Sequence, residues 1–329
     1  MKDLKFNLFS FLLACFLVFS FFVIKDEKND QEKKIYNIGV LEPMNHKALD
    51  LIFKGMKDEL EKNGYVDGKN IKINLRNANG DQSNLSLMAE KLIDEKNDVL
   101  VGITTLSSVT FLNATKDIPI VISGVTFPKE SGLVKDEKKS NTNVTGVSDR
   151  TDLKKEFQLI KKVMPNIKKI GILFTASEDN AKRQASEMEN ILKNEKIEVV
   201  VNSIMNSNDI NQVAQSLSKN VDAIFVPIDN TIASSMTTLT KITDKYKIPV
   251  FPSADSMVKD GGLLALGVDQ YKIGENTAKI IIKILSGENP GDIPISFEKD
   301  CDIFLNEKKA KSLNIKIPQE ILKKCKIVN

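Results

Sequence analysis

The sequence of residues 221–231 is VDAIFVPIDNT, an apolar run that ends abruptly in Asp229, Asn230 and Thr231. A helical pattern follows it, so the stretch predicts a buried strand that leads directly into a helix. In an open α/β sheet, the carboxyl ends of the strands form the edge where ligands bind. Asp229 and Asn230 therefore have two compatible interpretations: they cap the helix, or they contact a ligand at the sheet edge.

The composition excludes several classes of function. The chain has 329 residues, 41% of them apolar, which is enough for one large or two medium domains. Its 47 basic and 44 acidic residues are interspersed, so they do not indicate a nucleic-acid surface. A catalytic triad or His-based metal site would depend on the single histidine, His46, which we expect to start a helix and face solvent or a cleft rim. Cys301 and Cys325 could pair in an oxidising compartment or remain free thiols.

Residues 1–34 predict an export or anchoring segment that lies outside the fold. Residues 6–24 are almost continuously apolar, and residues 25–34 form a charged linker. Three alternatives stay open: lipidation at Cys15, which follows the lipobox-like Leu12-Leu13-Ala14, an uncleaved membrane anchor, or cleavage further downstream. We predict an exported, extracytoplasmic protein that is tethered to a membrane, in the periplasm or on the outer face of the cell membrane.

Strand and helix patterns alternate from residue 35 onward. Residues 35–145 predict the order β-α-β-α-β-α-β, which describes a doubly wound parallel sheet. The pattern then repeats: residues 38–40 correspond to 170–172, residues 97–101 to 221–225, and residues 117–121 to 247–251. The sequence therefore predicts two α/β lobes of the same design.

The remaining residues do not form a third lobe. They contain a turn and strand near residues 261–269, a helix over 270–285 and short elements beyond a break at 287–291. Such a tail can cross between lobes as a multi-strand hinge. We expect lobe 1 to span residues 35–145 with part of 256–290, and lobe 2 to span residues 146–255 with part of 291–329.

Motifs for catalysis and nucleotide binding are missing. The sequence contains no P-loop, HExxH, GxSxG or CxxC. The first strand is followed by Glu42-Pro43-Met44-Asn45, where a dinucleotide site would need glycines. We therefore predict no enzyme activity, no cofactor and no metal site.

Small polar residues instead follow the predicted strands of both lobes and would face each other across a cleft. They are Glu42, Thr104, Thr105, Ser107, Ser108 and Ser123 from lobe 1, Ser177, Asn180, Asp229, Asn230 and Asp255 from lobe 2, and Asp269 from the tail. The helix N-termini at Ser107 and Ser177 suit a carboxylate, and the three aspartates suit an ammonium group. A zwitterion with one group on each lobe would close the cleft. Caps and turns are the alternative roles for these side chains.

Six segments match a known pattern in order. They are HKALD (46–50), NANGDQS (77–83), ATKDIPIV (114–121), NVTGVSD (143–149), SEDN (177–180) and VPIDNTIA (226–233). Together they resemble the tryptophan/tyrosine-type substrate-binding proteins of bacterial ABC transporters. The resemblance implies a type I periplasmic-binding fold, ligand capture by closure of the lobes, and an ABC permease and ATPase as partners.

Two segments depart from that family. Thr104-Thr105-Leu106-Ser107-Ser108 stands where members often have Ala-Thr-Pro-Ala-Ala, which makes the lobe 1 side of the cleft more polar. Thr126-Phe127-Pro128 stands where members often have Thr-Asp-Pro, which adds a ring that could stack on an aromatic ligand.

These observations together predict an extracytoplasmic solute-binding protein of an ABC importer. Its expected ligand is an amino acid held between the lobes, and the expected class is aromatic (Trp, Tyr or Phe). The alternative is a ligand-sensing module that feeds a signalling partner. The absence of a helix-turn-helix or kinase segment from the sequence favours the importer.

Overall fold

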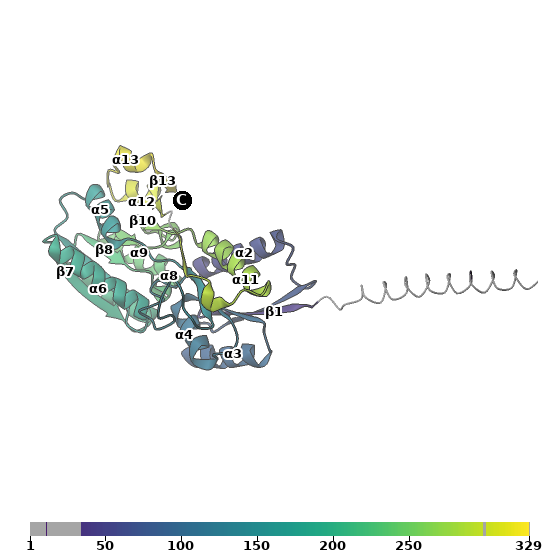
Figure 1. The fold of residues 1–329 in the computed structure, drawn as a ribbon. Coiled ribbons are helices and arrows are strands. Elements are labelled where there is room, and N and C mark those ends of the chain that lie inside the picture. Colours follow the sequence, from purple (N-terminus) through teal and green to yellow (C-terminus); the bar gives the residue numbers. More distant parts are fainter. Residues whose placement is uncertain (1–10, 12–33, 299–300, 329) are drawn as a thin grey trace, which may run out of the picture.

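The computed structural model describes residue 11, residues 34–298 and residues 301–328, and Figure 1 shows them as two α/β lobes. Apart from Phe11 and Lys34, the predicted export or anchor segment lies outside the described residues, and so does its possible lipidation site, Cys15. Within those described ranges, no helix is long and apolar enough to cross a membrane. Cys301 and Cys325 are both free thiols.

Lobe 1 is built on a six-stranded parallel sheet with the order β11-β5-β4-β3-β1-β2. Its strands are β1 (Tyr36–Glu42), β2 (Ile71–Asn77), β3 (Val99–Ile103), β4 (Ile120–Ser123), β5 (Val144–Ser148) and β11 (Ser296–Phe297). Its helices are α2 (Lys47–Lys62), α3 (Gln82–Asp94), α4 (Thr104–Ala114) and α11 (Gln270–Leu285). Alternate residues of β3 enter two apolar clusters, Val99 and Val101 packing with α2 and α11, and Leu100 with α3 and α4.

Lobe 2 is built on a four-stranded parallel sheet with the order β7-β6-β8-β9. Its strands are β6 (Lys169–Thr175), β7 (Glu198–Ile204), β8 (Ala223–Val226) and β9 (Val250–Pro252). Its helices are α5 (Leu153–Val163), α6 (Asp179–Asn194), η1 (Ser207–Asp209), α7 (Ile210–Ser218), α8 (Asn230–Ser234), α9 (Met236–Lys245) and α10 (Asp255–Lys259).

The internal repeat is confirmed at the level of topology. The strand orders β2-β1-β3-β4 and β7-β6-β8-β9 are the same. The polar groups that begin the strands repeat too: the Asp98 carboxylate accepts from the backbone N–H of Asn37 at 2.8 Å, and Asp222 accepts from Lys169 at 2.9 Å. The fold class, two doubly wound parallel-sheet lobes, is therefore the one that the sequence predicts.

The tail is shared between the lobes, and β5 belongs to lobe 1. The boundary expected between residues 145 and 146 falls inside β5, which pairs with β4. The chain then enters lobe 2, returns to lobe 1 as α11 and β11, and ends on lobe 2 as β12 (Asp302–Leu305), α12 (Glu307–Ser312), α13 (Gln319–Leu322) and β13 (Cys325–Ile327). A short helix, η2 (Pro290–Asp292), precedes β11. Three passages of chain thus connect the lobes.

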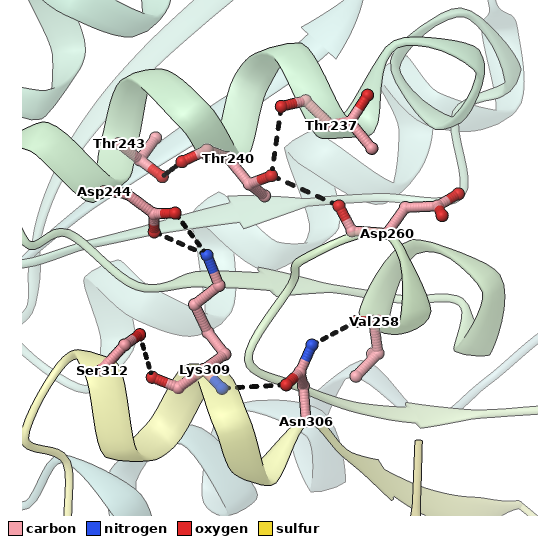
Figure 2. A network of polar contacts seen from close by, with 9 residues as sticks. All are labelled: Thr237, Thr240, Thr243, Asp244, Val258, Asp260, Asn306, Lys309 and Ser312. Carbon is pink, nitrogen blue, oxygen red and sulfur yellow. Dashed lines mark hydrogen bonds and ion pairs between the residues drawn. The ribbon is translucent and has the colours of Figure 1, made fainter. Parts of the chain in front are cut away.

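The C-terminal elements complete lobe 2. β10 (Leu264–Gly267), β12 and β13 form a mixed sheet, and the Leu263 N–H just before it bonds to the Val250 carbonyl of β9 at 2.7 Å. Figure 2 shows how α12 is attached: the Lys309 ammonium meets both oxygens of Asp244 at 2.6 Å, and the Asn306 amide donates to the Val258 carbonyl at 3.2 Å. The Lys309 side chain is largely buried, so the tail is a fixed part of the lobe.

Helices α2 and α11 lie side by side in lobe 1 (Figure 1). Gly55 and Gly274 allow this contact, because a Cβ at Gly274 would lie 2.0 Å from the Ile52 carbonyl oxygen and one at Gly55 would lie 2.1 Å from that of Tyr271. The N-terminal ends of both helices reach the space between the lobes.

Candidate functional site

Two cavities lie between the lobes. The inner pocket has a volume of about 30 Å³ and is lined by His46, Ala48, Leu49, Ile52, Thr104, Thr105, Gly124, Asp149, Asn180, Ile228, Asp229, Asn230, Ala233, Ala254, Ser256, Met257 and Gln270. The outer groove has a volume of about 500 Å³ and is lined by residues 43–45, 79–82, Leu85, Leu106, Ser177, Glu178, residues 205–207, Asn230, Thr231 and Ser234. Asn230 lines both, so the two cavities are neighbours.

Five buried polar atoms of the inner pocket have no hydrogen-bond partner. They are His46 Nδ1, Thr104 Oγ1, Thr105 Oγ1, Asp149 Oδ1 and Ser256 Oγ. Buried polar groups are normally paired, and each one left unpaired costs about 1–3 kcal/mol. Both lobes contribute to this set. The inner pocket therefore has the chemistry of a site for a polar ligand.

Thr104 adds a strained backbone to the same pocket. Its φ is +77°, a left-handed conformation that is unusual for a β-branched residue. It begins α4, whose N-terminus has no side-chain cap. Strain of this kind tends to occur at functional sites, and here it places an unpaired hydroxyl beside uncapped helix amides.

A hydrogen-bond chain crosses from lobe 1 to lobe 2 through His46. Its Nε2 lies 3.1 Å from Asn230 Oδ1. The Asn230 amide nitrogen donates to Glu178 Oε2 at 2.7 Å, so the amide oxygen of Asn230 faces the imidazole ring. Nε2 of His46 therefore carries the proton that this oxygen accepts, and Nδ1 is unprotonated and can accept a hydrogen bond. Burial lowers the pKa of His46, which favours this neutral form. The imidazole thus joins the lobes directly.

Glu178 holds the lobe 2 end of that chain in place. Its Oε2 accepts from the Asn230 backbone N–H at 2.9 Å, and its Oε1 accepts from the N–H and the hydroxyl of Thr231, each at 2.8 Å. One buried carboxylate therefore fixes the first turn of α8. Lys47 and Asp260 form a second contact between the lobes, as an ion pair.

Asp229 has a structural role at the end of β8. Its carboxylate caps α8 by accepting from the Ile232 N–H at 2.8 Å, and it also accepts from the N–H and hydroxyl of Thr175 at 2.5 and 2.9 Å. Burial, and then the charge of Glu178, raise the pKa of Asp229. The cap interpretation of this residue therefore holds, although the residue also borders the inner pocket.

The structure brings about half of the predicted site residues together. Thr104, Thr105, Asn180, Asp229 and Asn230 line the inner pocket, and Ser177 lines the outer groove. The other predicted residues do not line either cavity; they are Glu42, Ser107, Ser108, Ser123, Asp255 and Asp269.

Local contacts explain most of these positions. Glu42 accepts from Asn77, and burial raises its pKa; Ser107 is fully buried within α4. The hydroxyl of Ser108 donates to the Thr104 carbonyl, and that of Ser123 is hydrogen-bonded to the hydroxyl of Thr277.

The two aspartates outside the cavities also have local partners. Asp255 pairs with Lys259 at 2.8 Å, and Asp269 caps α11 by accepting from the Tyr271 N–H. Phe127 is buried and lines neither cavity.

Sequence reasoning missed five polar residues of the inner pocket and its border: His46, Asp149, Glu178, Ser256 and Gln270. Asp149 follows β5 directly, so the strand-end rule would have found it had residues 144–148 been taken as a lobe 1 strand. Among the residues that the structure describes, no cluster of three or more His, Cys, Asp and Glu side chains could hold a metal ion.

Two lobes with this topology, joined by three passages of chain, define the type I periplasmic-binding fold. Residues 37–328 match the family described as "ABC transporter substrate binding protein", so the chain belongs to this family of solute-binding proteins. Both the fold class and the family that the sequence predicts are confirmed.

Three similar proteins are informative. A tyrosine-binding protein of Clostridioides difficile (strain R20291) is 38% identical over 290 residues, which are 88% of this chain and 84% of that protein. An ABC domain from Streptococcus pneumoniae in complex with L-Trp is 39% identical with a TM-score of 0.87, over 90% of this chain and 100% of that one. A ligand-free, open substrate-binding protein with adhesive properties from Clostridium difficile is 37% identical with a TM-score of 0.70, over 90% of this chain and 99% of that one. At similar identity, the present structure is closer to the L-Trp complex.

Proposed function

We propose that this protein captures an aromatic amino acid between its lobes and delivers it to an ABC importer. The observation that carries the proposal is the inner pocket, where buried polar atoms from both lobes converge without partners. A zwitterionic head group would supply donors and acceptors to both sides at once, and so would stabilise the closed arrangement.

The two neighbouring cavities suggest how such a ligand lies. The inner pocket is far smaller than the 300–1,000 Å³ of ordinary ligand sites, whereas the outer groove is within that range. We place the α-amino and α-carboxylate groups in the inner pocket and the ring toward the outer groove, near Met44 and Leu106. Entry then requires the lobes to separate, which breaks the His46–Asn230 contact.

The aromatic class is supported by the relatives, one named for tyrosine and one solved with L-Trp. Import implies a permease and an ATPase as partners and an extracytoplasmic location. We propose that the N-terminal apolar segment provides the export signal and a membrane tether, with Cys15 as the candidate lipidation site.

Calorimetric titration of the purified protein with L-Trp, L-Tyr and L-Phe tests the proposal. Binding of at least one of them with a stoichiometry of about one is expected, since the proposal places a single ligand between the lobes. A folded protein that bound none of the three would contradict the aromatic assignment. An amino acid of another class that bound instead would retain the receptor function and change only its ligand.

A further inference from the structure

Asp149 lines the inner pocket and follows β5 immediately in the sequence. Its side chain is buried, with 3% of the residue exposed, and Oδ1 has no hydrogen-bond partner. Gly124 lies opposite: a Cβ there would be 3.7 Å from Asp149 Oδ2. The absence of a side chain at Gly124, which also has a φ of +65°, keeps this side of the carboxylate open.

Asp149 has no cationic partner within the part of the chain that the structure describes. Among the described residues, no Lys or Arg nitrogen lies within 4 Å of its carboxylate; the adjacent Arg150 meets Glu137 at 3.1 Å and the Phe297 ring at 4.8 Å. The inner pocket contains two carboxylates, those of Asp149 and Asp229, but no Lys or Arg. Burial raises the pKa of Asp149 to about 6, as expected for a carboxyl group without a counterion.

The other aspartates considered for an ammonium group have partners already. Asp229 accepts three hydrogen bonds from Thr175 and Ile232, and Asp255 is paired with Lys259. Asp269 caps α11 outside both cavities. Asp149 is therefore the carboxylate of the pocket that still has an oxygen available.

We propose that Asp149 binds the α-ammonium group of the ligand and thereby makes an amine obligatory for binding. This inference rests on the proposed function and names the group that the site selects. The ligand carboxylate then lies toward the hydroxyls of Thr104 and Thr105 and the uncapped amides of α4, which are neutral donors at a helix N-terminus. A ligand that keeps the carboxylate and lacks the amine would bring a second negative charge to Asp149 without neutralising it.

The test compares amino acids with their desamino analogues. L-Tyr and 3-(4-hydroxyphenyl)propionate, and L-Trp and indole-3-propionate, are titrated into the wild-type protein and into Asp149→Asn. The wild type is expected to prefer the better-bound amino acid over its analogue by about 100-fold or more, because an unmatched buried charge is costly. The affinity of Asp149→Asn for the amino acid should fall by most of that factor. The preference for the amino acid over its desamino analogue should then be about tenfold or less.

A matched variant separates the binding role of Asp149 from a general effect of removing a negative charge. Asp152→Asn changes an exposed carboxylate that caps α5, where Asn also caps well, and should bind like the wild type. An unchanged preference for the amine in Asp149→Asn would overturn the assignment while leaving the proposed function intact. A folded wild-type protein that bound neither amino acid would overturn the proposed function, and the Asp149 assignment with it.

Discussion

His46, the only histidine of the chain, forms a side-chain contact between the lobes, whereas the sequence indicated a helix start at a cleft rim. Its Nε2–H reaches Asn230 across the interface, and its Nδ1 remains an acceptor within the inner pocket. One ring can thus stabilise the closed form and offer a hydrogen bond to a ligand donor.

Replacing His46 with Ala should weaken ligand binding. The loss of one neutral hydrogen bond costs about 1 kcal/mol, or roughly fivefold in affinity. The effect should fall on the dissociation rate, because separation of the lobes breaks this contact. Stopped-flow fluorescence and calorimetry with the best-bound aromatic amino acid would measure both. Lys54→Ala, on an exposed part of the same helix, is the control. Equal dissociation rates for His46→Ala and the wild type would contradict a role for His46 in holding the lobes together.

Glu156 is a buried carboxyl group near the passages that join the lobes. Ser253 donates to its Oε2 at 2.8 Å, and Thr151, at the start of lobe 2, donates to its Oε1. Burial raises the pKa of Glu156 from 4.5 to about 7, and the nearby charges of Asp152 and Glu187 act in the same direction. The folded protein therefore binds a proton here that the unfolded chain releases at lower pH.

The stability contributed by Glu156 should decline as the pH rises. It is fully present below the unfolded pKa of 4.5 and is lost as the pH passes through about 7, with a total of about 3 kcal/mol. Urea unfolding of the wild type and Glu156→Gln between pH 5 and 8 tests this. The free energy of unfolding of the variant should rise relative to the wild type across this range. A difference between the two proteins that did not depend on pH would contradict the raised pKa.

At the scale of elements, the contact between α2 and α11 positions both helix starts at the inner pocket. Helix propensity alone predicts that Gly274→Ala stabilises the protein by about 1 kcal/mol. Packing predicts the opposite, because the new Cβ would lie 2.0 Å from the Ile52 carbonyl oxygen. We expect destabilisation by about 2 kcal/mol, measured by urea unfolding.

Gly287→Ala is the control for this prediction. That residue has a φ of +100° with no atom within 4 Å of the added Cβ, so it should cost only about 1 kcal/mol of backbone strain. A more stable Gly274→Ala protein would show that the two helices can separate at little cost.

Local patterns were sufficient to predict the elements and the repeat. Apolar runs such as residues 99–103 and amphipathic spacing such as that of α2 depend on neighbours in the sequence. The assignment of β5 to lobe 1 depends instead on its pairing with β4, and no local pattern encodes it. This is why Asp149, which follows β5, was not predicted.

The polar site was only partly predictable for a related reason. An aspartate at a strand end can cap the next helix or meet a ligand, and the sequence signal is the same in both cases. Asp229 and Asp269 cap helices, whereas Asp149 has a free oxygen, and burial and partners alone distinguish them.

At the scale of the whole molecule, the empty closed form should be unfavourable. Five buried polar atoms in the inner pocket lack partners, and water reaches such groups when the lobes separate. Small-angle X-ray scattering should therefore give a larger radius of gyration without ligand than with a saturating aromatic amino acid. The ligand-free relative with an open structure agrees with this expectation. Identical scattering in the two states would contradict it.

The shared tail also governs when the protein can fold. α11 and β11 complete the core of lobe 1, and β10, β12 and α12 complete that of lobe 2, so both cores depend on residues after 263. Domains generally fold as units during synthesis, the N-terminal one first. Here lobe 1, whose first strands are synthesised before lobe 2, must wait for helix α11, which follows the whole parallel sheet of lobe 2 in the sequence. The core of lobe 1 therefore stays unfinished while all of the lobe 2 sheet is synthesised, and during that period a chaperone can still bind its exposed apolar strands.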